Sequence, residues 1–171
     1  MESRAKLMGH AIHPILVMFP AGLLLAAVVF DLLRLFTGSK RWGEVAYWNM
    51  VGGIGSGLVA AVPGIIDWSH LPDESRAKRV GLVHMIANVT GLLLFSASVL
   101  MRRDSQEQPS TAALGAALVG ASAIGLGGYL GGELVERLGV GVTPGAHVDA
   151  PPSLTQPNWR AEGRPMFDEG Q

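Results

Sequence analysis

Two histidines and two carboxylates are the residues of this sequence whose types and positions best fit cofactor chemistry. His13 and His84 each lie near the start of a long apolar run, and Asp67 and Glu133 each close one. Ionisable side chains in a membrane span are costly to bury, so they mark candidate functional sites. Two imidazoles suit the axial positions of a haem iron, whereas imidazoles and carboxylates together suit a transition-metal ion. The sequence therefore predicts haem b held by His13 and His84, or alternatively a metal ion held by all four residues.

Other kinds of chemistry have no residue basis here. The chain contains no cysteine, which excludes disulfides, thiolate metal sites and cysteine catalysis. It has no phosphate-binding loop, no serine nucleophile elbow and no short zinc motif. The formal net charge is -1, and no basic stripe alternates with aromatic residues. We therefore expect no nucleic-acid partner and no independent catalytic activity.

The elements that must position the four residues are long apolar helices. Apolar residues make up 49% of the chain and charged residues only 16%, whereas soluble domains carry about a quarter charged residues. Four stretches of about 20 residues hold at most one titratable residue each, a length that crosses a hydrocarbon core of roughly 30 Å. The predicted transmembrane helices cover residues 14–36, 45–66, 80–101 and 111–136.

These helices predict an all-α fold, an integral membrane four-helix bundle with up-down-up-down topology, over residues 1–142. Because consecutive helices alternate in direction, both histidines and both carboxylates fall on one membrane face. Pro20 and Pro63 should kink the first two helices near that face. A structural alternative for each histidine is a hydrogen bond to a carbonyl that these prolines free, or to a carboxylate.

An internal repeat is visible in the same residues. The spacing from His13 to Asp67 resembles the spacing from His84 to Glu133. If an axis along the membrane normal relates the two halves, the histidines should face one another across the bundle.

Small and charged residues predict how the helices pack. Gly57 and Gly128 belong to rows of small residues, which let helices approach closely within the bundle or form a homodimer face. We expect both glycines to be intolerant of larger side chains. Asp31 ends an apolar run and should pair with Arg34 or Arg102.

The segment 143–171 differs from the rest of the chain. It is rich in proline and has no apolar period, so we expect a flexible tail that is dispensable for insertion. Its large aromatic residues, Trp159 and Phe167, are the expected anchors if the tail binds a partner.

Several short motifs resemble the bacterial family of membrane proteins called domain of unknown function 2231. The resemblance covers roughly residues 10–142. The motifs are His13-Pro-Ile-Leu-Val-Met-Phe-Pro20, Gly64-Ile-Ile-Asp67, His84, Gly128-Tyr-Leu-Gly-Gly-Glu-Leu-Val135 and Gly139-Val-Gly-Val142. Met18 and Leu138 stand where relatives carry histidines, so any site in the family that uses those histidines is incomplete here.

The resemblance implies a multi-pass protein of the bacterial plasma membrane, and it names no reaction. Some relatives carry a C-terminal Rieske iron–sulfur domain, which implies electron transfer, but this chain lacks the cysteines for one. Our functional interpretation is a small redox-associated membrane subunit that contacts the lipid bilayer and a redox partner protein. The alternative is a non-catalytic membrane scaffold whose polar residues are structural.

Overall fold

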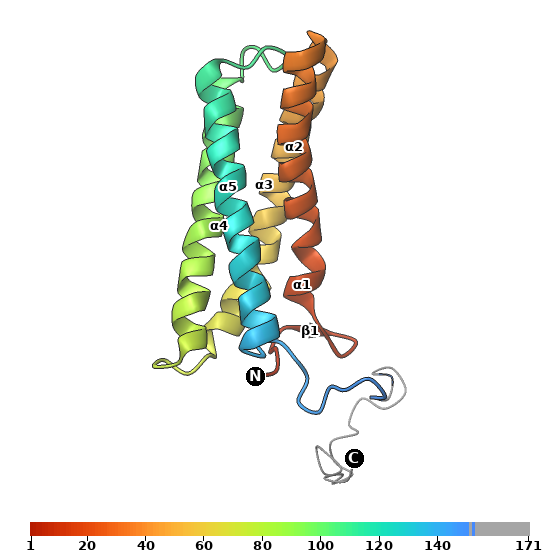
Figure 1. The fold of residues 1–171 in the computed structure, drawn as a ribbon, viewed down its shortest axis with the longest axis vertical. Helices are drawn as coiled ribbons and strands as arrows, with labels where there is room; N and C mark the ends of the chain where they lie inside the picture. The colour runs from red at the N-terminus through yellow and green to blue at the C-terminus, as the bar shows by residue number, and fades with distance from the viewer. Residues whose placement is uncertain (151, 153–171) are drawn as a thin grey trace.

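The computed structural model describes residues 1–150 and 152 of the 171-residue chain. The expected tail anchors, Trp159 and Phe167, lie outside these residues. A short β-hairpin precedes a bundle of long helices that run side by side (Figure 1). The elements are β1 (Lys6–Leu7), β2 (His10–Ala11), α1 (Ile12–Leu16), α2 (Met18–Thr37), α3 (Lys40–Ser69), α4 (Arg76–Met101), α5 (Thr111–Gly132) and a π-helical turn, η1 (Glu133–Arg137).

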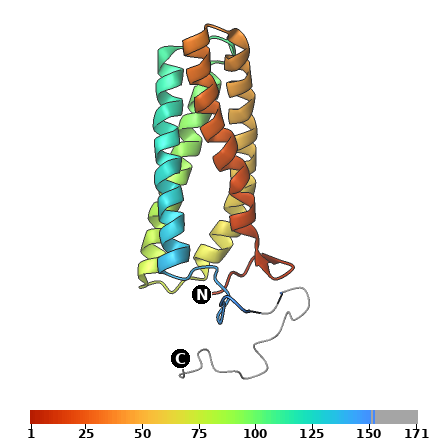
Figure 2. The ribbon, with the colours of Figure 1, turned by 45° about the vertical axis from the view of Figure 1, so that its right-hand side comes forward.

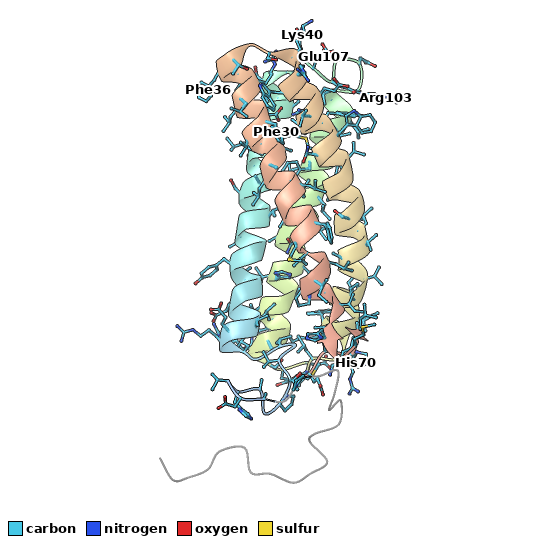
Figure 3. All side chains as sticks on the ribbon, turned by 90° about the vertical axis from the view of Figure 1, so that its right-hand side faces the viewer. Phe30, Phe36, Lys40, His70, Arg103 and Glu107 are labelled. Carbon is cyan, nitrogen blue, oxygen red and sulfur yellow. The ribbon has the colours of Figure 1, made fainter. Side chains whose placement is uncertain are left out.

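Four spans of this bundle are long and apolar enough to cross a membrane, with α1 and α2 together forming the first and α5 and η1 the last. Only 22–28% of each apolar window is buried inside the protein, so most apolar side chains face outward. Figure 3 shows Lys40, Arg103 and Glu107 at one end of the bundle and His70 at the other. The all-α, multi-pass membrane fold predicted from the sequence is confirmed.

Local residue choices set several helix ends. The Ser75 and Ser110 hydroxyls accept hydrogen bonds from the Lys78 and Ala113 amides and so cap α4 and α5. Gly38 ends α2 in the left-handed region, at φ +70°, and its N–H returns to the Arg34 carbonyl.

Pro20 breaks the first span. Proline has no N–H to donate to the carbonyl of Leu16, four residues earlier, and its ring clashes with that carbonyl. The helix α1 ends at Leu16, and α2 begins at Met18. α1 begins at Ile12, before the expected start at Pro14, so the first histidine lies inside the helix. By contrast, α3 continues through Pro63 without interruption.

The bundle consists of two helical hairpins. α2 packs along α3, and α4 packs along α5, whereas contacts between the two pairs are fewer. In Figure 2 the ribbons of the two pairs diverge toward the end that holds the N-terminus. Gly57 lies between the hairpins, because a Cβ there would be 2.8 Å from Leu92 Cδ2 and 3.5 Å from Pro20 Cβ.

Gly128 does not pack as the sequence suggested. It is exposed, and nothing lies within 4 Å of where its Cβ would be. The preceding residue, Gly127, is buried, and a Cβ there would be 2.5 Å from Asn88 Nδ2. A step of one residue turns a helix by about 100°, since 3.6 residues make a turn, so the prediction for Gly128 was wrong.

Burial repeats between the two hairpins. The buried residues of α2 are Pro20, Leu24, Ala27 and Asp31. Each has a buried counterpart 71 residues further along the chain. These counterparts are Gly91, Phe95, Ser98 and Arg102. The same step of 71 residues separates Asp31 from Arg102 and the first bundle histidine from the second. Buried positions of α3 recur in α5 with a different step, of 67 residues, which separates Ala46 from Ala113 and Ala60 from Gly127. Both steps support an internal repeat.

A buried ion pair joins the two helical hairpins at the end of the bundle that holds the α2–α3 and α4–α5 loops, which we call the loop end. Arg102 is 1% exposed and Asp31 3%, and the guanidinium donates two hydrogen bonds, of 2.9 and 3.0 Å, to the carboxylate. Arg102 also donates to the Ser98 hydroxyl, which in turn donates to the Ala113 carbonyl. Asp31 therefore pairs with one of its two expected partners, while Arg34 contacts the Glu107 carbonyl instead.

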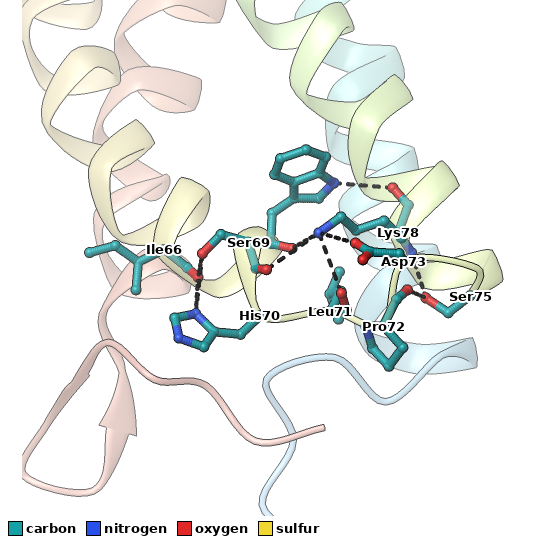
Figure 4. Close-up of polar contacts among 9 residues, drawn as sticks. Ile66, Ser69, His70, Leu71, Pro72, Asp73, Ser75 and Lys78 are labelled. Carbon is teal, nitrogen blue, oxygen red and sulfur yellow. Dashed lines mark hydrogen bonds and ion pairs between the residues drawn. The ribbon is translucent and has the colours of Figure 1, made fainter.

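The hairpins are joined covalently at the other end by the α3–α4 turn (Figure 4). The Lys78 ammonium donates to the carbonyls of Trp68, Ser69 and Leu71, and so caps α3. The Trp68 indole donates back to the Lys78 carbonyl at 3.1 Å, and Leu71 is buried beneath the turn. These bonds hold the end of α3 against the start of α4.

Replacing Gly57 with leucine should destabilise the bundle, by at least about 1–3 kcal/mol, because the side chain would overpack the space between the hairpins. Gly128→Leu is the matched control and should leave stability nearly unchanged, since its side chain points outward. Thermal unfolding in detergent measures both. Equal losses in the two variants would contradict the rotational register of α5 described above.

Removing one partner of the buried ion pair should also be costly. Asp31→Leu or Arg102→Met alone should destabilise the protein by about 3–5 kcal/mol, because each leaves an uncompensated buried charge. The double variant should be more stable than either single variant. A double-mutant cycle by thermal unfolding checks this, and additive losses would show that the two side chains do not interact.

Candidate functional site

The first histidine is fixed between α1 and α3. The carbonyl of Ala60 lies 2.8 Å from His13 Nδ1. Gly64, one turn further along α3, leaves room for the ring, because a Cβ there would be only 2.8 Å from His13 Cε1. A carbonyl oxygen can only accept, so Nδ1 carries a proton, and in the neutral form of the ring the lone pair lies on Nε2.

The second histidine repeats this arrangement between α4 and α5. His84 Nδ1 lies 2.8 Å from the Gly127 carbonyl, and a Cβ on Gly131 would be 3.2 Å from His84 Cε1. His84 lies about two turns into α4, which starts at Arg76, and is thus deeper than the sequence suggested. Each hairpin therefore orients one imidazole by the same combination of a carbonyl acceptor and a glycine.

Asn88 completes the surroundings of His84, one turn further along the same face. Its amide donates to the His84 carbonyl at 2.8 Å and lies 3.3 Å from His84 Nε2. The bare backbone of Gly127 makes room for this amide.

The two rings meet between the hairpins. Their centroids are 6.3 Å apart and their planes are inclined at 82°. Both side chains are half-buried. The structure therefore brings together the two histidines that the sequence singled out, as the internal repeat suggested.

The two carboxylates have other partners. Asp67 accepts hydrogen bonds from Ser3 and from the backbone of Arg4 and Ala5. Glu133 forms a 2.6 Å ion pair with Arg76. Within residues 1–150 and 152, no three histidine, aspartate or glutamate side chains are grouped closely enough to hold a metal ion.

The register of the repeat explains why the carboxylates separate. Ala60 in α3 corresponds to Gly127 in α5, because both accept the histidine hydrogen bond. The same offset matches Asp67 with the buried Leu134, and not with Glu133. The sequence could not identify the two carbonyl acceptors, because every residue carries a backbone carbonyl and the residue type does not single one out.

In chemical terms, the arrangement resembles the surroundings of histidines that bind metals. Such histidines donate one ring N–H to a carbonyl or carboxylate, and this second contact fixes the tautomer and the ring orientation. Here both Nδ1 atoms are engaged in this way. The ring atoms left for a ligand are therefore the two Nε2 atoms, one from each hairpin, and that of His84 lies beside the Asn88 amide.

Comparison with known proteins places these features in a family without a described reaction. A family model described as "Predicted membrane protein (DUF2231)" matches residues 9–144, which include both hairpins and both histidines. No curated protein and no solved structure matches the chain.

Proposed function

Because the chain belongs to the DUF2231 family of predicted membrane proteins, whose description names no reaction, we propose a function from its own geometry. The protein is a small redox-associated membrane subunit in which His13 and His84 hold one haem b between the two hairpins. The observation that carries this proposal is the pair of imidazoles, 6.3 Å apart, each with its Nδ1 committed to a carbonyl.

The separation of the rings suits two ligands on opposite sides of one metal atom. Two metal–nitrogen bonds of about 2.0–2.1 Å, with half a ring on each side, place the centroids roughly 6 Å apart. The observed distance is 6.3 Å. The inclination of the planes is no obstacle, because each imidazole can take any rotation about its own metal–nitrogen bond.

The ligand count favours haem over a bare ion. A structural metal site takes about four protein ligands, yet the nearby carboxylates bind other groups: Asp67 the N-terminal segment and Glu133 Arg76. A porphyrin brings four nitrogens of its own and needs only two axial ligands. A transition-metal ion held by His13, Asp67, His84 and Glu133 would require both carboxylates to leave their present partners.

The residues of this chain would bind and orient the cofactor. His13 and His84 would hold the haem b, which would supply one-electron exchange. Ala60 and Gly127 would keep both imidazoles in the ligating tautomer. This chemistry suits electron transfer with a partner protein in a bacterial plasma membrane.

A second candidate is the non-catalytic scaffold. The same hydrogen bonds tie α1 to α3 and α4 to α5, so each histidine also stabilises its own hairpin. On this hypothesis the imidazoles only satisfy backbone groups.

An absorption spectrum of the purified protein distinguishes the haem-binding function from the scaffold function. Protein purified from haem-replete cells, or reconstituted with haemin in detergent, should show a Soret band that shifts on reduction. His13→Ala and His84→Ala should each lose the six-coordinate spectrum, whereas His70→Ala, which changes an exposed histidine outside the site, should keep it. Metal analysis of the same samples tests the bare-ion alternative. A folded, colourless and metal-free parent, whose histidine variants only melt earlier, would overturn the cofactor proposal in favour of the scaffold.

A further inference from the structure

Asp67 is a buried carboxylate that binds a segment outside the helices. It is 9% exposed and accepts from the Ser3 hydroxyl and the Arg4 amide, both at 2.7 Å, and from the Ala5 amide at 3.3 Å. Ser3 is itself only 5% exposed. Burying a carboxylate is costly unless donors compensate it, and here the donors come from residues 1–5, which we call the N-terminal strap.

The strap reaches from one hairpin to the other. The Met1 carbonyl accepts from the Gly141 amide at 2.8 Å, and Glu2 forms a parallel bridge with Gly141, just after the second hairpin. At its other end, the Ala5 carbonyl accepts from the Ile12 amide at 2.9 Å, at the start of α1. Figure 1 shows the N-terminal trace crossing below the bundle, between the end of α5 and β1.

The crossing lies on the same end of the bundle as the histidines. Asp67 is three residues beyond Gly64, the glycine that packs against His13, and so lies about one turn closer to the helix end. Ile12, which the strap holds, directly precedes His13. The strap thus crosses from one hairpin to the other at the end of the bundle where their ribbons diverge (Figure 2).

We infer that the N-terminal strap closes the histidine site toward the aqueous side, and that Asp67 is the positioning residue that holds it closed. Exchange of a haem or of any polar solute with the site then requires release of the strap. The cofactor part of this statement rests on the proposed function, whereas the closure itself rests on the contacts of Asp67. Asp67 acts through the strap, without touching the histidines.

Because the chain contains no cysteine, a single introduced thiol can report access to the site. In the full-length His84→Cys protein, reconstituted in lipid, a charged, water-soluble methanethiosulfonate should label this thiol far more slowly than the exposed thiol of His70→Cys. Adding Asp67→Ala should accelerate labelling of the His84→Cys protein at least roughly tenfold, since the three hydrogen bonds that the strap donates to the carboxylate are lost. Cofactor binding is not needed for this readout.

Three further variants separate closure from other effects. Asp67→Asn keeps an acceptor for the Arg4 and Ala5 amides and should label nearly as slowly as the His84→Cys parent. Glu133→Gln removes the ion pair with Arg76 at the same end without touching the strap, and should leave the rate unchanged. Ser3→Ala loses one strap bond and alters no helix, so it should give a smaller acceleration even if Asp67→Ala fails to fold.

Two results would overturn the closure. One is an His84→Cys thiol that already labels as fast as the exposed His70→Cys thiol. The other is a rate that neither Asp67→Ala nor Ser3→Ala changes. A colourless protein with the predicted labelling pattern would instead reject only the haem proposal.

Discussion

The buried pair between Asp31 and Arg102 is the interaction on which the arrangement of the two hairpins depends. Lipid tails are as apolar as leucine, so apolar surface alone gives transmembrane helices little reason to choose a register. A charge left unpaired at this depth is costly, and the bidentate contact pairs the two charges in a single relative position of α2 and α4. One fixed contact at the loop end thereby sets the register of the whole interface.

The histidine pair follows from that register. Equivalent positions of the first and third spans are separated by a constant step of 71 residues, so a contact between equivalent positions at one end favours contacts between equivalent positions along this interface. Asp31 faces Arg102 at the loop end, and His13 faces His84 toward the other end. In each hairpin a glycine-lined helix supplies the carbonyl that orients the ring. The histidine pair thus joins equivalent positions of the two hairpins.

The sequence predicted the features that depend on composition and period. Uncharged stretches of sufficient length predicted the four spans, and the cost of a buried carboxylate predicted a cationic partner for Asp31. Features that depend on rotation by a single residue were not predictable, and the prediction for Gly128 failed for this reason. Asp67 was interpreted as a candidate ligand, but its partners belong to a short non-helical segment that carries no periodic signal.

The central claim is that both imidazoles are held with Nδ1 protonated, which leaves the lone pair of each neutral ring on Nε2. Solid-state nitrogen-15 NMR of histidine-labelled protein in lipid, without added cofactor, tests this claim most directly. The account predicts that His13 and His84 both show a protonated, hydrogen-bonded Nδ1 and an unprotonated Nε2, assigned by comparison with spectra of His13→Ala and His84→Ala. A proton on Nε2 of either neutral ring, with Nδ1 unprotonated, would contradict it.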